Sequence, residues 1–230
     1  SPLQTGLGAW ADFSPTTRLT LGFSQGERLP SFTEQFYQSP ANTGNPGLLP
    51  ERSLSLNLNA SHTWHSATTN LLVWTRFQKD VIDWIRPSGN PVWLAVNHPR
   101  QDLWGALVNH TLFLPGQTLR LAVEYTGVLQ QELSSSQVVS KYGLRFTRWR
   151  LSARHDWLIS PRWSTGSSLT WRELVDHLDQ ALDLTLHLER HLRNLDIGIA
   201  LENALNQRLE AIAGILGPGR TVSLRFRWTP

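Results

Sequence analysis

The strongest constraint on this chain is a two-residue alternation of apolar and polar side chains that returns in segment after segment. It is clearest at residues 53–64, where serine and asparagine separate Leu54, Leu56, Leu58 and Ala60. Successive side chains of a β-strand point to opposite faces, so the pattern predicts strands with one apolar and one polar face. The apolar face meets a core in a soluble sheet and lipid in a membrane barrel, and periodicity alone fits both.

The connections between the expected strands favour the barrel. We expect about eleven strands, at residues 6–12, 18–25, 53–64, 69–85, 103–114, 119–129, 141–159, 163–171, 182–188, 195–201 and 221–228. Short turns alternate with long loops, which we expect at residues 26–52, 86–100, 130–140, 172–180 and 203–218, with a short extended piece at 92–95. Outer-membrane barrels have short turns at the periplasmic end and longer loops outside, whereas a soluble sandwich has no reason to gather its long loops at one end.

Residues 141–159 have two interpretations. The apolar positions are even up to Phe146 and odd from Trp149 onward. Such a change of phase fits a β-bulge in one long strand or a tight turn between two short strands. We favour one bulged strand, because no Gly, Pro, Asn or Asp marks a turn there and a second strand would break the alternation of turns and loops.

Composition excludes several classes of protein. No apolar run approaches the ~20 residues of a membrane-spanning helix. Eleven tryptophans among 230 residues, with only 17% charged residues, fit the aromatic girdles of a barrel, and a soluble sandwich with a tryptophan-rich core is the other interpretation. The absence of cysteine excludes disulfides and thiolate metal sites. Basic residues are scattered, so we predict no nucleic-acid surface.

Four motifs in order along the chain resemble a known family. The first motif has two parts: residues 28–37 read R-x-P-S-F-x-E-x-F-Y, and residues 44–53 read G-N-P-x-L-x-P-E-x-S. A strand with aspartates and a terminal aromatic follows at residues 77–85, then E-N-A-L-N-Q at 202–207 and G-P-G-R-T-V at 217–222. Together they resemble the late-barrel signature of TonB-dependent outer-membrane receptors, the siderophore and cobalamin transporters of Gram-negative bacteria. Two departures are Ala204 and Leu205 in place of the usual Leu and Phe, and Thr229 and Pro230 after the terminal aromatic Trp228.

The resemblance implies an all-β fold, the C-terminal half of an antiparallel transmembrane β-barrel. We expect residues 1–230 to form one barrel domain without a plug domain. The implied protein is no enzyme and needs no cofactor. It lies in the outer membrane of a Gram-negative bacterium and takes up a metal chelate, such as a ferric siderophore or cobalamin, with TonB acting through a plug outside this chain. The alternative is a small β-barrel pore without a plug and with passive conductance.

The number of strands leaves the assembly open, because large outer-membrane transporters use about 22 strands around a plug. The chain is expected to be a fragment of a longer receptor, a reduced barrel that closes on itself, or half of a two-chain barrel. An unclosed barrel in lipid is excluded, since each unsatisfied backbone group would cost several kcal/mol.

The resemblance also places the candidate ligand-binding residues in the outside loops. Aromatic rings there could stack on a siderophore or corrinoid, and arginines could attract an anionic ferric chelate; these residues are Arg28, Phe36, Tyr37, Arg86 and Trp93. The competing interpretation is that such aromatics belong to the girdles. Asp80 and Asp83 could form an acid pair or a cation site, although a solvated loop edge fits them better. The eight histidines are dispersed, and no catalytic or metal site is predicted.

Overall fold

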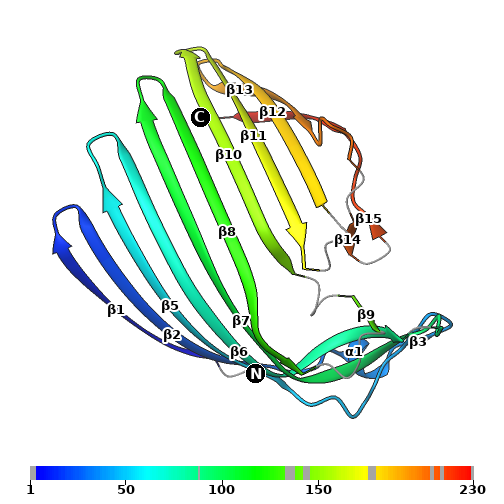
Figure 1. Ribbon diagram of the computed structural model, residues 1–230. Coiled ribbons are helices and arrows are strands. Elements are labelled where there is room, and N and C mark those ends of the chain that lie inside the picture. The colour runs from blue at the N-terminus through cyan, green and yellow to red at the C-terminus, as the bar shows by residue number, and fades with distance from the viewer. Residues whose placement is uncertain are drawn as a thin grey trace. The chain divides into compact units, whose positions relative to one another are not determined.

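The computed structural model describes residues 4–87, 89–132, 138–141, 146–175, 180–207, 210–212 and 215–228, and strands dominate them (Figure 1). One sheet of 14 strands contains a path of hydrogen-bonded neighbours in the order β1-β2-β5-β6-β7-β8-β10-β11-β12-β13-β16. The bounds on this path are β1 Gln4–Ser14, β2 Thr17–Arg28, β5 Glu51–Thr63, β6 Ala67–Pro87, β7 Trp93–Leu114, β8 Gln117–Glu132, β10 Thr147–Ser160, β11 Trp163–Leu174, β12 Gln180–His191, β13 Leu195–Glu202 and β16 Thr221–Trp228. The path has eleven members in the described part of the chain, so the expected set of strands is confirmed.

Shorter elements occupy the segments expected as long loops. The loop after β2 holds the helix α1 Phe32–Phe36 and the strands β3 Gln38–Ser39 and β4 Asn42–Thr43. β9 Val138–Ser140 lies between β8 and β10, and β14 Glu210–Ile212 and β15 Ile215–Leu216 pair with each other between β13 and β16. Ser31 explains where α1 begins, because its hydroxyl accepts a hydrogen bond from the N–H of Glu34 while the Glu34 carboxylate accepts one from the N–H of Ser31.

Contacts divide the chain into two compact units. Unit 1 comprises Ser1–Ala60, Leu72–Ala106 and Thr126–Phe146, and unit 2 comprises Ser61–Leu71, Leu107–Tyr125 and Thr147–Pro230. The expectation of a single barrel domain stays a prediction.

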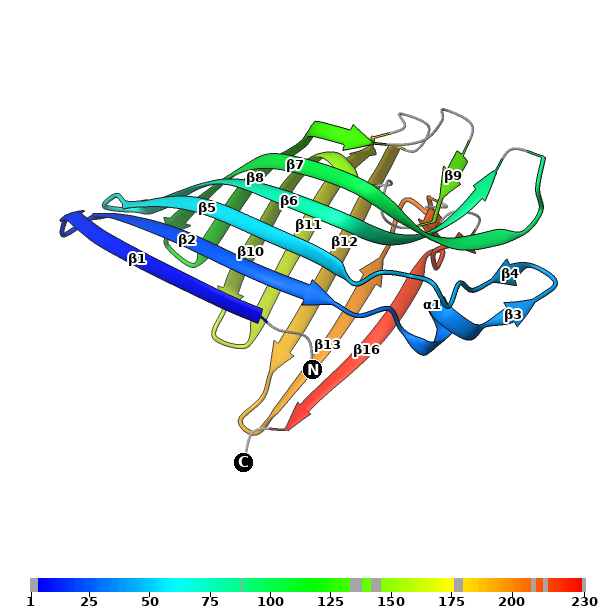
Figure 2. The same cartoon turned by 90° about the horizontal axis from the view of Figure 1, so that it is seen from below.

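In unit 1, β1 and β2 form a hairpin whose two faces differ as the alternation requires. Leu7 lies opposite Phe23 and Ala9 opposite Leu21 on one face, while Asp12 lies opposite Arg18 on the other. β4 pairs in parallel with β7, and Figure 2 shows α1 beside the β3–β4 hairpin. A small core forms here from the buried side chains Leu48, Ile82, Trp84 and Ala95, with Trp93 packed against it.

The expectation of a loop at residues 86–100 was wrong for most of that segment. β6 continues to Pro87 and β7 begins at Trp93, so strand structure replaces most of the predicted loop. Long-range contacts stabilise these strand ends: the Asn97 amide donates to the carbonyls of Leu49 and Asp80, at 3.0 and 2.7 Å. Asp80 has a φ of 54°, which marks an irregularity within β6. Pro99 lies exposed within β7, where the local turn signals in the sequence were misleading.

The change of phase near Thr147 has a counterpart in unit 2. β10 begins at Thr147, and its register with β11 shifts between Thr147 and Trp149, as the bulge interpretation expects. Residues 142–145 of that prediction lie outside the described residues.

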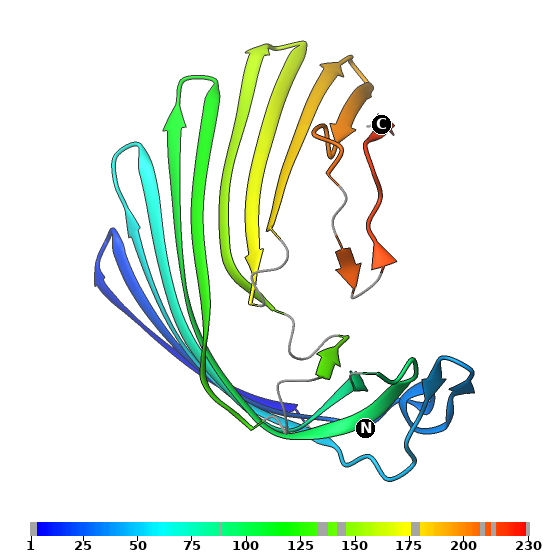
Figure 3. The same ribbon diagram turned by 45° about the vertical axis from the view of Figure 1, so that its right-hand side comes forward.

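Unit 2 contains consecutive antiparallel neighbours. β8 pairs with β10, and then β10, β11, β12, β13 and β16 pair in that order. Figure 3 shows β10, β11 and β12 side by side, and a short turn at residues 161–162 joins β10 to β11. The register keeps one apolar row across the unit, with Leu188 opposite Ile199 and Ile199 opposite Leu224.

Candidate functional site

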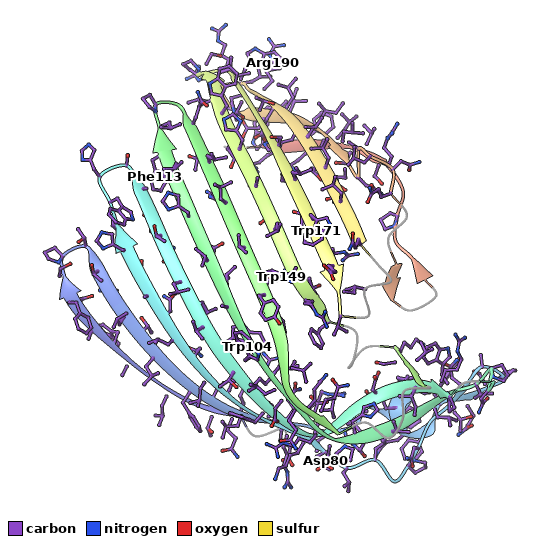
Figure 4. All side chains as sticks on the ribbon, in the orientation of Figure 1. Asp80, Trp104, Phe113, Trp149, Trp171 and Arg190 are labelled. Atoms are coloured by element: carbon purple, nitrogen blue, oxygen red, sulfur yellow. The ribbon has the colours of Figure 1, made fainter. Side chains whose placement is uncertain are left out.

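An apolar band bounded by tryptophans covers one face of unit 2. Trp149 and Trp157 lie on β10, and Trp163 and Trp171 lie on β11. Each pair is eight residues apart, so nine residues span the band on each strand, within the ~9–11 residues that a tilted transmembrane β-strand needs. Figure 4 labels Trp149 and Trp171, which mark the loop end of the band. The expected aromatic girdle is therefore present on these strands.

Between the two tryptophan levels this face carries the exposed Leu151 and Leu169, together with Ala153 and the half-buried polar residues His155, Thr165 and Ser167. Leu151 lies opposite Trp171 with 41% of its surface exposed, and Leu169, at 42%, lies opposite Ala153. Tyr125 lies opposite Trp149, with ring centroids 4.5 Å apart. A large hydrophobic face of this kind marks an interaction surface on a protein in water.

The opposite face of unit 2 is polar. One row runs across three strands from Asp156 through Gly166 to His187. A Cβ atom at Gly166 would collide with the His187 ring, so the glycine lets His187 approach Asp156, with Nε2 and Oδ1 3.8 Å apart. Asp156 also accepts from the guanidinium of Arg154 at 2.9 Å. Hollows on this face are lined by Arg154, Thr185, His187, Glu189, Ser223 and Arg225.

A chain of hydrogen bonds at the turn end of this face has the order of a hydrolase triad. His191 Nε2 lies 2.9 Å from Ser164 Oγ, and His191 Nδ1 lies 3.0 Å from Asp196 Oδ1. Hydrolysis also needs donors preorganised for the oxyanion. Ser164 lies in a strand paired on both sides, opposite Leu158 and Glu189, so the N–H groups around it belong to the sheet. The two hydrogen bonds instead connect the ends of β11, β12 and β13.

Arg28, one of the predicted ligand residues, lies in a network of ion pairs in unit 1. Its guanidinium donates to Glu34 at 3.0 Å and to Glu51 at 3.1 Å. Glu51 also accepts from the N–H of Ile82, at 3.2 Å. The two parts of the first family motif, at residues 28–37 and 44–53, therefore meet at this arginine, and a ligand role for Arg28 stays a prediction.

Electrostatics at this network favour ionised groups. Burial raises the pKa of Glu34, but hydrogen bonds from Ser31 and the positive charge of Arg28 outweigh burial, so its pKa lies below the ordinary value of 4.5. For Arg28 burial lowers the pKa, and the carboxylates of Glu34 and Glu51 more than compensate, so its pKa is raised. Arg28 and Glu34 are therefore both ionised at neutral pH.

Arg86 and Trp93, two further predicted residues, contact each other. The Arg86 guanidinium carbon lies 4.9 Å from the centre of the Trp93 ring. Lys141 Nζ lies 5.4 Å from the same ring and 6.0 Å from the Trp84 ring. We call Arg86, Trp93, Lys141 and Trp84 the cation–indole cluster. Two cations beside one indole create a positive, partly aromatic surface suited to an anionic aromatic ligand.

Phe36 and Tyr37 lie at the end of α1. Phe36 is 50% exposed and packs on Phe32, with ring centroids 5.1 Å apart. Tyr37 is 47% exposed, and its N–H donates to the carbonyl of Thr33, ending the helix. The structure shows no contact between these rings and the cation–indole cluster, and ligand contact stays a prediction for both.

A buried polar group lies behind the cation–indole cluster. Asp83 accepts a very short hydrogen bond from Ser140 Oγ and another from the N–H of Trp84, at 2.7 Å. His98 Nε2 lies 3.8 Å from Asp83 Oδ2. Asp83 is 1% exposed, so its prediction as a solvated loop edge is wrong. The burial comes from β9, which pairs with β6 through Ser140 opposite Ile85.

Sequence reasoning missed Lys141 and Ser140. Ser140 is the last residue of the serine-rich segment 130–140, for which the sequence predicts a loop, and Lys141 follows it; their partners Asp83 and Trp93 are distant in the sequence. Among the described residues, no group of three or more His, Asp or Glu side chains could hold a metal ion. No described helix is long and apolar enough to cross a membrane.

Comparison with known proteins gives one family. Residues 5–183 match the family model described as TonB dependent receptor-like, beta-barrel. No curated protein matches the chain.

Solved structures of related architecture are distant in sequence. A mutant of the ferric enterobactin receptor PfeA from Pseudomonas aeruginosa is similar with a TM-score of 0.70 and 18% identity over 97% of this chain and 39% of that one. The siderophore receptor PirA from Acinetobacter baumannii is similar with a TM-score of 0.68 and 11% identity, over 98% of this chain and 40% of that one. The copper transporter OprC is similar with a TM-score of 0.71 and 13% identity, over 96% of this chain and 38% of that one. Identities this low show the fold alone, and the chain spans about two fifths of each structure.

Proposed function

Because the chain belongs to the family of TonB-dependent receptor-like β-barrels, we propose that it forms barrel wall and outside loops of an outer-membrane receptor for a metal chelate. The cargo would be a ferric siderophore or a corrinoid such as cobalamin. Transport would depend on TonB, acting through a plug domain outside these residues. The similar solved structures are receptors and transporters for ferric enterobactin, other siderophores and copper, which supports this class of cargo.

The tryptophan-bounded band of unit 2 is the observation that best supports a location in the membrane. On β10 and on β11, nine residues run from one tryptophan to the other, within the ~9–11 residues with which a tilted β-strand crosses the hydrocarbon. Exposed leucines lie within the band, and charged side chains lie on the other face of the same strands. Lipid on one side and water on the other stabilise such a sheet.

Further strands are needed at both ends of the pairing order. β1 and β16 are the terminal members of the path of neighbours among the described residues. In hydrocarbon, their unpaired N–H and C=O groups would each cost several kcal/mol. We therefore propose that other strands of the same barrel pair with these two edges.

The ligand surface is proposed at the cation–indole cluster. Arg86 is exposed, and the Trp93 ring beside it is partly accessible. An anionic ferric chelate would gain both charge attraction and stacking there. Phe36, Tyr37 and Arg28 belong to the same unit, and we propose them as further loop contacts.

The test is chelate uptake by cells that depend on this protein. Uptake of radiolabelled ferric siderophores and cobalamin is compared with and without the gene, and with and without TonB. Accumulation of at least one chelate that requires both supports the proposal. Steady conductance of the purified protein in a planar bilayer, together with uptake that is independent of TonB, contradicts it and indicates a pore without a plug.

A further inference from the structure

We propose that Arg190 and Trp163 bind the phosphodiester of a membrane glycerophospholipid at the turn end of the apolar band. The inference rests on the proposed membrane function, and it adds a specific lipid site to it. The occupant is a lipid headgroup, whose phosphate is the group recognised.

The two side chains form a pair across neighbouring strands. Arg190 on β12 lies directly opposite Trp163 on β11, and its guanidinium carbon lies 5.3 Å from the centre of the indole. Both are exposed, Trp163 to 38% of its surface. A cation–π contact of this kind attracts the guanidinium to the indole without using its N–H donors, which remain for an anion.

The register places Arg190 on the apolar row. Leu186 and Leu188 precede it at two-residue intervals, and Ile197 lies opposite it on β13. A charged side chain in this row would be costly within hydrocarbon. At the height of Trp163, however, it reaches the interface, where tryptophans gather and long cationic side chains extend to the headgroups.

The charges around Arg190 leave it able to bind an anion. Among the residues that the structure describes, no carboxylate pairs with it. The neighbouring Glu189 points to the other face by register, and Asp196 is engaged by His191. The adjacent turns contribute two more exposed arginines, Arg162 and Arg193. A guanidinium matches two phosphate oxygens in a bidentate arrangement.

The position of the site at the turn end of the apolar band indicates which lipid leaflet supplies the phosphate. Short turns of outer-membrane barrels face the periplasm. Trp163 follows the short turn at residues 161–162, and Arg190 precedes the turn at residues 192–194. We therefore assign the site to a glycerophospholipid of the periplasmic leaflet.

The test measures lipid binding by the full-length protein in detergent micelles. Phosphatidylglycerol is titrated, and bound lipid is counted by native mass spectrometry, with diacylglycerol as the lipid that lacks phosphate. We expect Arg190→Gln to weaken phosphatidylglycerol binding about tenfold, the loss of one charge-assisted contact. Binding of diacylglycerol should be equal in both proteins.

The matched control is Arg76→Gln. Arg76 also lies beside an indole, 5.7 Å from the Trp74 ring, but by strand alternation it lies on the polar face. Its substitution should leave phosphatidylglycerol binding unchanged. Native-like circular dichroism of each variant shows that the barrel has folded.

Three results overturn the lipid site: equal affinity of wild type and Arg190→Gln, an equal loss in Arg76→Gln, or displacement of the lipid by 10 mM inorganic phosphate, which indicates a free-anion site. Failure of the wild type to insert into liposomes contradicts the membrane function itself. The two failures are therefore distinguishable.

Discussion

The guanidinium of Arg86 lies 4.9 Å from the centre of the Trp93 ring, and this contact joins the end of β6 to the start of β7. Lys141 approaches the same ring, and its N–H donates to the carbonyl of Trp84 at 2.9 Å. Three segments of unit 1 thus meet at one positive, aromatic surface. A ligand that carries both negative charge and flat rings would contact all three.

Arg86→Gln should weaken binding of the transported chelate about tenfold, because a charge-assisted contact contributes about 1.5 to 3 kcal/mol. The dissociation constant of the ferric chelate, measured by fluorescence quenching on purified protein, checks this. Arg193→Gln is the control, since Arg193 is an exposed arginine in a short turn of unit 2. Equal dissociation constants for Arg86→Gln and wild type would exclude Arg86 from the ligand surface.

Glu34 should make the protein less stable in acid. Its pKa is lower in the folded protein than in the unfolded chain, so its contribution to stability is fully present above the unfolded value. That contribution is lost as the pH falls below 4.5 through the folded pKa. Glu34→Gln should lower the free energy of unfolding by about 1 to 3 kcal/mol at pH 7.

Urea unfolding at pH 7 and at pH 3 measures this effect. The difference between wild type and Glu34→Gln should shrink at pH 3, where the wild-type carboxyl is increasingly protonated. Glu202→Gln serves as a control, because Glu202 lies exposed on β13 in unit 2. A constant difference between wild type and Glu34→Gln at both pH values would contradict the ion-pair explanation.

Gly105→Ala should destabilise unit 1 by about 1 to 3 kcal/mol through overpacking. A Cβ atom at this position would lie 2.5 Å from two carbons of the Trp74 indole, so the ring would have to shift. Gly8→Ala is the matched control, because a Cβ there would meet only the carbonyl oxygen of Leu21, at 3.8 Å. Thermal unfolding followed by circular dichroism compares the two variants, and equal midpoints would show that Trp74 moves freely.

Local pattern was sufficient to predict the strands but not all of their ends. The last strand, residues 221–228, was predicted with its observed bounds because its apolar positions alternate without a break. At residues 86–100, prolines and a glycine suggested a loop, while the strands are held by the long-range contacts of Asn97. The alternation of apolar and polar residues within a segment carries no information about a contact with a loop some fifty residues away.

The candidate site was predictable in residue type but not in partners. Arg28 was selected for its charge, and the structure shows that charge paired with Glu51, 23 residues later. Arg86 and Trp93 were selected separately, and β6 and β7 bring them together. Lys141 has no local motif, so only its placement after β9 reveals its contact with Trp93.

Ser140→Ala should loosen the docking of β9 on β6. The Ser140 hydroxyl donates to the buried Asp83, and its loss leaves one carboxylate oxygen without that donor in a site that is 1% exposed. The loss of one hydrogen bond to such a buried group costs about 1 to 3 kcal/mol. The three residue pairs between β9 and β6 are few, so local opening should rise before global unfolding does.

Hydrogen exchange at β9 measures this opening. We expect exchange of the Val139 and Ser140 amides to rise about tenfold in Ser140→Ala, with β10–β13 unchanged. Ser140→Thr keeps the hydroxyl and should preserve more of the protection. Because Lys141 follows directly, the same variant should weaken chelate binding if the cation–indole cluster is the ligand surface. Faster exchange with unchanged chelate affinity would separate β9 docking from ligand binding, and unchanged exchange would show that Asp83 does not hold β9.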